Sequence, residues 1–150
     1  MERHGLDEAV HARIQDLCAK GDALVQRKQF EQAFGHYRDA LNLVPQPAEE
    51  WEATTWILTA IGDLYFLAKM IPNALKAFKD AVHCPGGLGN PFIHLRLGQC
   101  YLDMGQEGLA ADELTRAYMG AGREIFKAQD PKYISFLETR IKPPVGQTGL

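Results

Sequence analysis

Small and large apolar residues recur along this chain at intervals that repeat. In each of three segments a glycine is followed by an alanine 12 residues later, then by a large apolar residue and a second alanine after 4 and 3 more. Small residues let two antiparallel helices cross closely, and large side chains fill the space beside the crossing. The pattern therefore predicts three helix pairs, built on Gly21, Ala33, Tyr37 and Ala40, on Gly62, Ala74, Phe78 and Ala81, and on Gly98, Ala110, Leu114 and Ala117.

The predicted helix pairs cover most of the chain and leave room for one more helix. They are expected near residues 7–44, 48–83 and 91–119. A final segment follows Asp130, which suits an N-cap, and starts with Pro131, which suits the first helical position. Its apolar residues have helical spacing, so it is expected to cap the last pair. We predict an all-α single domain over residues 1–142 and a flexible tail over 143–150.

Two insertions make the repeat irregular. Consecutive glycines of the pattern lie 41 and 36 residues apart, and the longer interval gains its extra residues in 47–54. An insertion of about seven residues is close to two helical turns, which keeps Trp51, Leu58 and Tyr65 on one helix face. We therefore predict a lengthened first helix in the second pair, with Trp51 packed against the first pair. The glycine- and proline-rich stretch 84–91 is predicted to be a loop.

The spacing and the residue types resemble the tetratricopeptide repeat (TPR), whose period is about 34 residues. The resemblance covers three copies, near 14–47, 55–88 and 91–124. It departs from the TPR pattern at Lys20, where an apolar residue is usual, and at Gly86 and Gly122, where a proline is usual. The resemblance implies a TPR α-solenoid of three helix pairs plus a C-terminal capping helix near 131–141.

Such a solenoid has a concave face lined mainly by the first helix of each pair. Counting from the repeat glycines gives an aromatic and acidic set of residues on this face. They are Asp22, Trp56, Thr59, Asp63, Phe66, Phe92, Leu95, Gln99 and Asp103, together with Cys18 and Val25. Aromatic anchors dominate many binding energies, and carboxylates favour a basic partner. In the alternative interpretation each aspartate only solvates its helix surface, and Phe66 and Phe92 belong to the core.

Composition and charge narrow the expected function to protein binding. A net charge of −3 and a pI of about 5.9 supply no basic stripe for nucleic acid. The sequence has no apolar run of membrane-spanning length, and its three cysteines lack CxxC spacing, which fits a cytoplasmic protein without disulfides. The histidines lack metal-binding spacing, and Cys100 is expected to be buried. We predict no enzymatic activity, no cofactor and no metal site.

The stretches 90–99, 117–122 and 130–133 also resemble a group of small bacterial TPR proteins, some of which are similar to toxin-immunity proteins. This resemblance implies an immunity protein whose partner is a toxin or effector domain with a basic surface. The inserted segment 47–54 favours a folded partner of this kind, because a protruding helix adds contact area outside the groove. The alternative is a TPR secretion chaperone or adaptor that holds a partner segment in the concave groove.

A third kind of TPR partner is excluded by the residues at the groove positions. Chaperone-binding TPR proteins use a basic clamp for a C-terminal carboxylate. Here Asp22, Asp63 and Asp103 occupy the groove positions, with only Arg96 nearby. The expected partner is therefore basic and not an acidic chain end.

Overall fold

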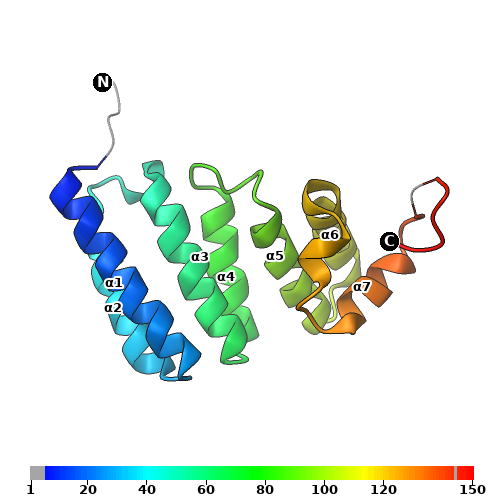
Figure 1. Ribbon diagram of the computed structural model, residues 1–150, viewed down its shortest axis with the longest axis horizontal. Coiled ribbons are helices and arrows are strands. Elements are labelled where there is room, and N and C mark those ends of the chain that lie inside the picture. The colour runs from blue at the N-terminus through cyan, green and yellow to red at the C-terminus, as the bar shows by residue number, and fades with distance from the viewer. Residues whose placement is uncertain (1–5, 144) are drawn as a thin grey trace.

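The structure, a computed structural model, describes residues 6–143 and 145–150. It is a row of antiparallel helix pairs that ends in one further short helix, with α1 at one end of the row and α7 at the other (Figure 1). This arrangement confirms the predicted all-α solenoid. Residues 1–5 of the predicted domain and Pro144 of the predicted tail lie outside the described residues.

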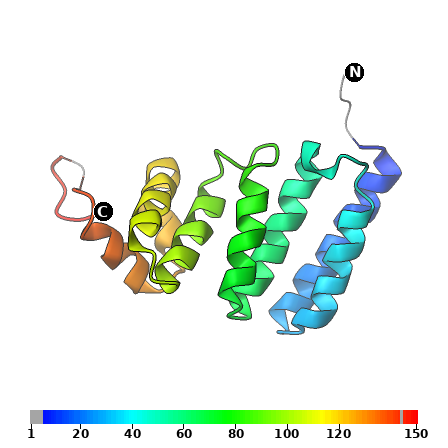
Figure 2. The same ribbon diagram turned by 180° about the vertical axis from the view of Figure 1, so that it is seen from behind.

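The long helices form the three predicted pairs. These are α1 (Glu8–Gln26) with α2 (Phe30–Asn42), α3 (Glu52–Leu67) with α4 (Ile71–Val82), and α5 (Pro91–Asp103) with α6 (Glu107–Ala121). Two 3-10 helices, η1 (Ala48–Glu50) and η2 (Arg123–Phe126), and the last helix α7 (Pro131–Glu138) complete the helices of the described residues. The helix α3 contacts both α1 and α5, so the first helices line one face, here called the α1–α3–α5 face. Figure 2 shows the row from the α2 side.

Each repeat glycine lies directly against the large residue of its own repeat. A Cβ atom added at Gly21, Gly62 or Gly98 would come within 2.6, 2.8 or 2.5 Å of the side chains of Tyr37, Phe78 and Leu114, respectively. Such distances are shorter than van der Waals contact, so any larger residue would push the paired helices apart. The predicted division of labour between small and large positions is confirmed.

The three turns inside the pairs have one conformation. In each turn a residue with φ between 61° and 78° precedes the N-cap of the second helix. The N-cap amide then donates a hydrogen bond to the carbonyl three residues after the repeat glycine. The donor and acceptor pairs are Gln29 and Leu24, Met70 and Tyr65, and Gln106 and Tyr101. Residues at the same offset from the repeat glycines are therefore structurally equivalent.

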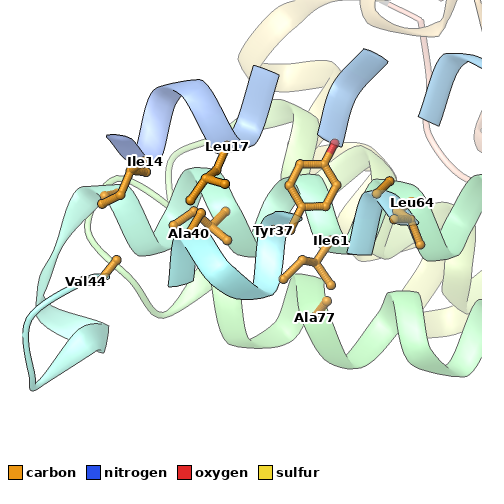
Figure 3. Close-up of a cluster of buried hydrophobic side chains, with 11 residues drawn as sticks. Ile14, Leu17, Tyr37, Ala40, Val44, Ile61, Leu64 and Ala77 are labelled. Carbon is orange, nitrogen blue, oxygen red and sulfur yellow. The ribbon is translucent and has the colours of Figure 1, made fainter. Parts of the chain in front are cut away.

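The apolar interior runs through the whole row. Figure 3 shows the first cluster, to which α1 contributes Ile14 and Leu17, α2 contributes Tyr37 and Ala40, and α3 contributes Ile61 and Leu64. A second cluster joins α4 to α5, and a third joins α5 and α6 to η2 and α7. Partly buried side chains connect the clusters, since Leu58 belongs to the edges of the first two and Phe92 to those of the last two. Stacked pairs thus share the core that none could build alone.

The inserted segment does not lengthen α3 by two turns. It forms η1, and the chain is then extended at Trp51, with φ −109° and ψ 137°, before α3 begins at Glu52. The Thr54 hydroxyl donates to the Ala48 carbonyl oxygen at 2.5 Å, which holds η1 across the start of α3. The prediction of a continuous helix was wrong because a side-chain hydrogen bond of this kind competes with the helix ladder. Trp51 does pack against the first cluster, as predicted.

The last helix caps the row. The Asp130 carboxylate accepts the Lys132 amide at 2.9 Å, which confirms the predicted N-cap, and α7 ends at Glu138, three residues before the predicted end. Its Tyr133 and Leu137 are buried with Leu95 and Leu114. In the described part of the tail, the Leu150 side chain is buried in this cluster and its amide donates to Glu138. The flexibility of the tail stays a prediction.

Candidate protein-binding site

A cleft of about 340 Å3 lies between α1 and α3 on the α1–α3–α5 face. It joins two carboxylates to apolar side chains, and we call it the α1–α3 cleft. Its lining residues are Asp22, Val25 and Gln26 from α1, Tyr37 from α2, and Ala60, Asp63, Leu64 and Leu67 from α3. The structure therefore brings together three of the residues predicted for this face, Asp22, Val25 and Asp63.

The Asp22 carboxylate is held in place by a buried phenol. The hydroxyl of Tyr37 donates to Asp22 Oδ1 at 2.5 Å, and the ring of Tyr37 packs against Gly21. Burial raises the pKa of Tyr37 first, and the hydrogen bond to Asp22 raises it further, so the phenol stays a neutral donor. Asp22 thus both lines the cleft and accepts a hydrogen bond from the buried Tyr37. The repeat glycine, the tyrosine and the aspartate are thus linked by direct contacts.

Three further predicted residues lie on α1 and α3 but are not among the lining residues of this cleft. Trp56 is 41% exposed, and its indole meets the ring of His11 edge to face at 5.5 Å. Thr59 is half-buried and donates its hydroxyl to the Thr55 carbonyl oxygen within α3, which satisfies it locally. Burial and the charge of Asp22 raise the pKa of the half-buried Cys18 to about 11, so it is a neutral thiol. Trp56 is the exposed aromatic group of this set.

The space between α3 and α5 that corresponds to the α1–α3 cleft is filled by Arg96. We call this space the α3–α5 cleft. The Arg96 side chain is 8% exposed, and its Nε donates to Asp63 Oδ1 at 2.7 Å. Its guanidinium carbon lies 4.4 Å from the ring centre of Phe66 and 4.9 Å from that of Phe92. Both aromatic rings are half-buried and stack on a cation of the same chain. Phe66 and Phe92 therefore fit the alternative interpretation, in which they belong to the interior, better than the prediction that they line an open groove.

Two predicted groove residues on α5 are buried, so that part of the prediction was wrong. Leu95 and Gln99 are both 0% exposed. Leu95 lies in the cluster formed with η2 and α7, and the Gln99 amide donates to Gln129 Oε1 at 2.9 Å. Arg96 Nη1 also donates to the side-chain oxygens of Gln99 and Gln129. The connector after α6 and the capping helix cover this end of the face, which repeat counting alone does not anticipate.

Asp103 connects the capping helix to α5. Both of its carboxylate oxygens accept the Tyr133 hydroxyl, at 2.9 and 2.8 Å, and Lys132 Nζ lies 3.1 Å from Oδ1. Burial and this hydrogen bond raise the pKa of Tyr133, which keeps it a donor at neutral pH. The charge of Asp103 is thus matched by Lys132 within the chain.

Sequence reasoning did not anticipate the roles of two polar residues that organise the second half of the face. One is Arg96, for which a signal exists, because the equivalent positions two residues before the other repeat glycines are Ala19 and Ala60. The other is His94, whose Nδ1 lies 2.7 Å from Glu113 Oε1 and whose Nε2 lies 2.5 Å from the Leu88 carbonyl oxygen. His94 is buried and ties the loop after α4 to α5 and α6. No spacing rule in the sequence indicates these partners.

No metal centre is visible in the described part of the chain. Its residues include no group of three His, Cys, Asp or Glu side chains arranged to hold a metal ion. Cys100 is fully buried, as expected, and burial raises its pKa to about 12. Within residues 6–143 and 145–150, no helix has the length and apolar character needed to span a membrane. A second cavity, of about 520 Å3, lies on the other side of the row between η1 and the ends of α2 and α4.

Comparison with known proteins supports the fold and leaves the family open. No family model matches the sequence, and no curated protein matches it. The structure is similar to the type III secretion chaperone SycD of Yersinia enterocolitica, solved in complex with a peptide of the translocator YopD. The TM-score is 0.68 at 16% sequence identity, over 89% of this chain and 95% of that chain. The likeness at this identity is one of fold, a TPR-like helical solenoid.

Proposed function

We propose that this chain is a non-catalytic protein-binding module that holds an extended segment of a partner protein on the α1–α3 part of its face. The observation that carries the proposal is the α1–α3 cleft, which combines apolar walls with a fixed carboxylate, while the exposed Trp56 lies on α3 about one helical turn before the lining residue Ala60. A cleft of this size suits individual side chains of a segment, and a nearby aromatic group supplies an anchor. No cofactor takes part in this activity.

The chaperone interpretation is favoured over the immunity interpretation. The similar secretion chaperone was solved with a peptide of its translocator, which supports segment binding by this fold. The immunity interpretation drew on a protruding helix in the inserted segment, and that segment instead forms η1 and an extended residue at Trp51. The three cysteines of the chain are free thiols, which is compatible with a chaperone that acts in the cytoplasm before its partner is exported.

Co-expression with the product of the adjacent gene tests the proposal. We expect a stable complex in which limited proteolysis leaves a short partner segment protected. Trp56→Ala should weaken the complex at least tenfold by calorimetry, because exposed aromatic anchors contribute about 2 kcal/mol or more. Met119→Ala is the matched control, since Met119 is 76% exposed on α6, away from the face.

Two outcomes would contradict the proposal. One is an unchanged affinity of the Trp56→Ala variant. The other is a complex with a folded partner domain whose toxic activity is lost on binding, so that co-expression of this chain rescues growth. That is the behaviour of an immunity protein. Solubilisation of the partner without rescue of growth supports the chaperone interpretation.

A further inference from the structure

The α1–α3 and α3–α5 clefts are built from equivalent positions. One residue after the repeat glycine lies an aspartate, which is Asp22 in the first unit and Asp63 in the second. Two residues before the next repeat glycine lies the residue that faces this aspartate across the cleft, Ala60 in one case and Arg96 in the other. The same framework therefore holds a guanidinium in one cleft and a methyl group in the other.

The surroundings of Arg96 also have counterparts in the α1–α3 cleft. Four residues after the repeat glycine, Phe66 in the α3–α5 cleft corresponds to Val25. Six residues before the next repeat glycine, the stacking ring of Phe92 corresponds to the exposed ring of Trp56. The hydrogen-bond acceptor Gln99 corresponds to Asp63.

We infer that the α1–α3 cleft binds an arginine side chain of the partner segment, in the place that Arg96 occupies in the α3–α5 cleft. The inference rests on the proposed function and specifies the chemistry of its partner. A guanidinium there would donate to Asp22 and lie against Val25 and Trp56, as Arg96 donates to Asp63 and lies against two phenylalanine rings.

The charge balance of the two clefts agrees with this occupant. Asp22 and Asp63 carry two negative charges along the α1–α3 cleft, and one of them, that of Asp63, is paired with the positive charge of Arg96. The excess of one negative charge is matched by one cation from outside. The Asp22 carboxylate needs no reorganisation, because Tyr37 already fixes its position. The planar guanidinium stacks on an indole better than an ammonium group does, which favours arginine over lysine.

The first test uses a blocked tripeptide with a central arginine, acetyl-Gly-Arg-Gly-amide, titrated into the 15N-labelled full chain and followed by NMR. We expect saturable shifts of the amides of Asp22, Ala60 and Asp63. The same tripeptide with citrulline, a neutral isostere of arginine, should bind about tenfold more weakly, as expected for the loss of one charge-assisted contact. Equal affinity of the two peptides, or shifts that do not include the cleft, would overturn the inference.

Variants of the cleft provide the second test. Asp22→Asn keeps an acceptor for the Tyr37 hydroxyl and removes the charge, so the fold is retained while arginine binding should fall about tenfold. Glu31→Gln is the matched control, because Glu31 is an exposed carboxylate on α2 outside the cleft. Ala60→Arg places the chain's own guanidinium in the cleft and should abolish binding of the arginine tripeptide.

The full partner separates failure of this inference from failure of the proposed function. If Trp56→Ala weakens the complex while Asp22→Asn and Ala60→Arg leave it unchanged, the face binds the segment without an arginine in the cleft, and the inference falls. If none of the three variants changes the affinity, the proposed function falls with it. Loss of affinity in all three, with Glu31→Gln unchanged, supports both.

Discussion

Replacement of Arg96 by alanine is the most direct test of the organisation of the α1–α3–α5 face. The arginine side chain is 92% buried, with its Nε on Asp63 and its Nη1 on two glutamine side chains. Arg96→Ala leaves these acceptors without their donor and empties the α3–α5 cleft. The variant should convert that cleft into a copy of the α1–α3 cleft, where alanine already stands at the equivalent position.

The cost of this substitution can be worked from the burial of the partners. Removing one member of a buried ion pair costs about 3–5 kcal/mol. The Asp63 side chain remains 32% exposed, so water partly solvates the carboxylate after the arginine is lost. The lower end, about 3 kcal/mol, is therefore expected. For a chain of this length it corresponds to a fall in Tm of about 6–12 °C.

Urea unfolding followed by circular dichroism at 222 nm measures this free energy. Arg116→Ala is the matched control, since Arg116 pairs with Asp112 at 3.5 Å and both side chains are more than half exposed. That exposed pair should contribute less than about 1 kcal/mol. If the two variants lose the same stability within error, Arg96 does not organise the face and the comparison of the two clefts loses its basis.

A small arginine derivative should restore part of the stability of Arg96→Ala. N-acetylarginine amide at five times its dissociation constant would stabilise the variant by about 1 kcal/mol, or about 2–4 °C in Tm. The citrulline derivative at the same concentration serves as the control for non-specific effects. Equal stabilisation by both compounds would show that the emptied cleft does not recognise the guanidinium.

Two further predictions concern the repeat framework. Gly62→Ala places a methyl group 2.8 Å from the ring of Phe78 and should destabilise the fold by about 1–2 kcal/mol. Gly35→Ala has free space around it in α2 and should stabilise the fold by about 0.5–1 kcal/mol in urea unfolding. A gain of stability in both variants would refute the packing role of Gly62. The raised pKa of Tyr37 means that the fold favours the neutral phenol, so the contribution of Tyr37 to stability is constant below about pH 10 and is lost above it. The Tyr37→Phe variant should therefore lose less stability between pH 9 and 11 than the wild type. An identical pH profile of the two proteins would contradict this prediction.

The sequence predicted the helix pairs well because the repeat encodes local steric rules. The spacing from Gly21 to Tyr37 specifies which residues meet across a pair, and that contact depends only on two neighbouring helices. The end of the last pair was also predictable, since Asp130 and Pro131 are local signals. Side-chain capping of η1 by Thr54 was missed, because the hydroxyl and its acceptor are six residues apart and follow no periodic pattern.

The candidate site was predictable only where a single helix face decides it. Asp22, Asp63 and Trp56 lie on the expected face because counting from the repeat glycines fixes their direction. Leu95 and Gln99 have the correct direction too, but η2 and α7 cover them through contacts about 30 residues away in sequence. Such long-range cover depends on the path of one connector, which repeat periodicity does not describe.

The contrast between Ala60 and Arg96 has a consequence for how a partner segment would align on the solenoid. A repeat surface is periodic, so a bound segment that fits one unit also fits the next and can slide by a whole repeat. Because its own Arg96 fills the α3–α5 cleft, a segment anchored in the α1–α3 cleft would lack that second position and would keep a single alignment. A repeat protein can in this way obtain a unique binding register from a symmetric scaffold through one substitution.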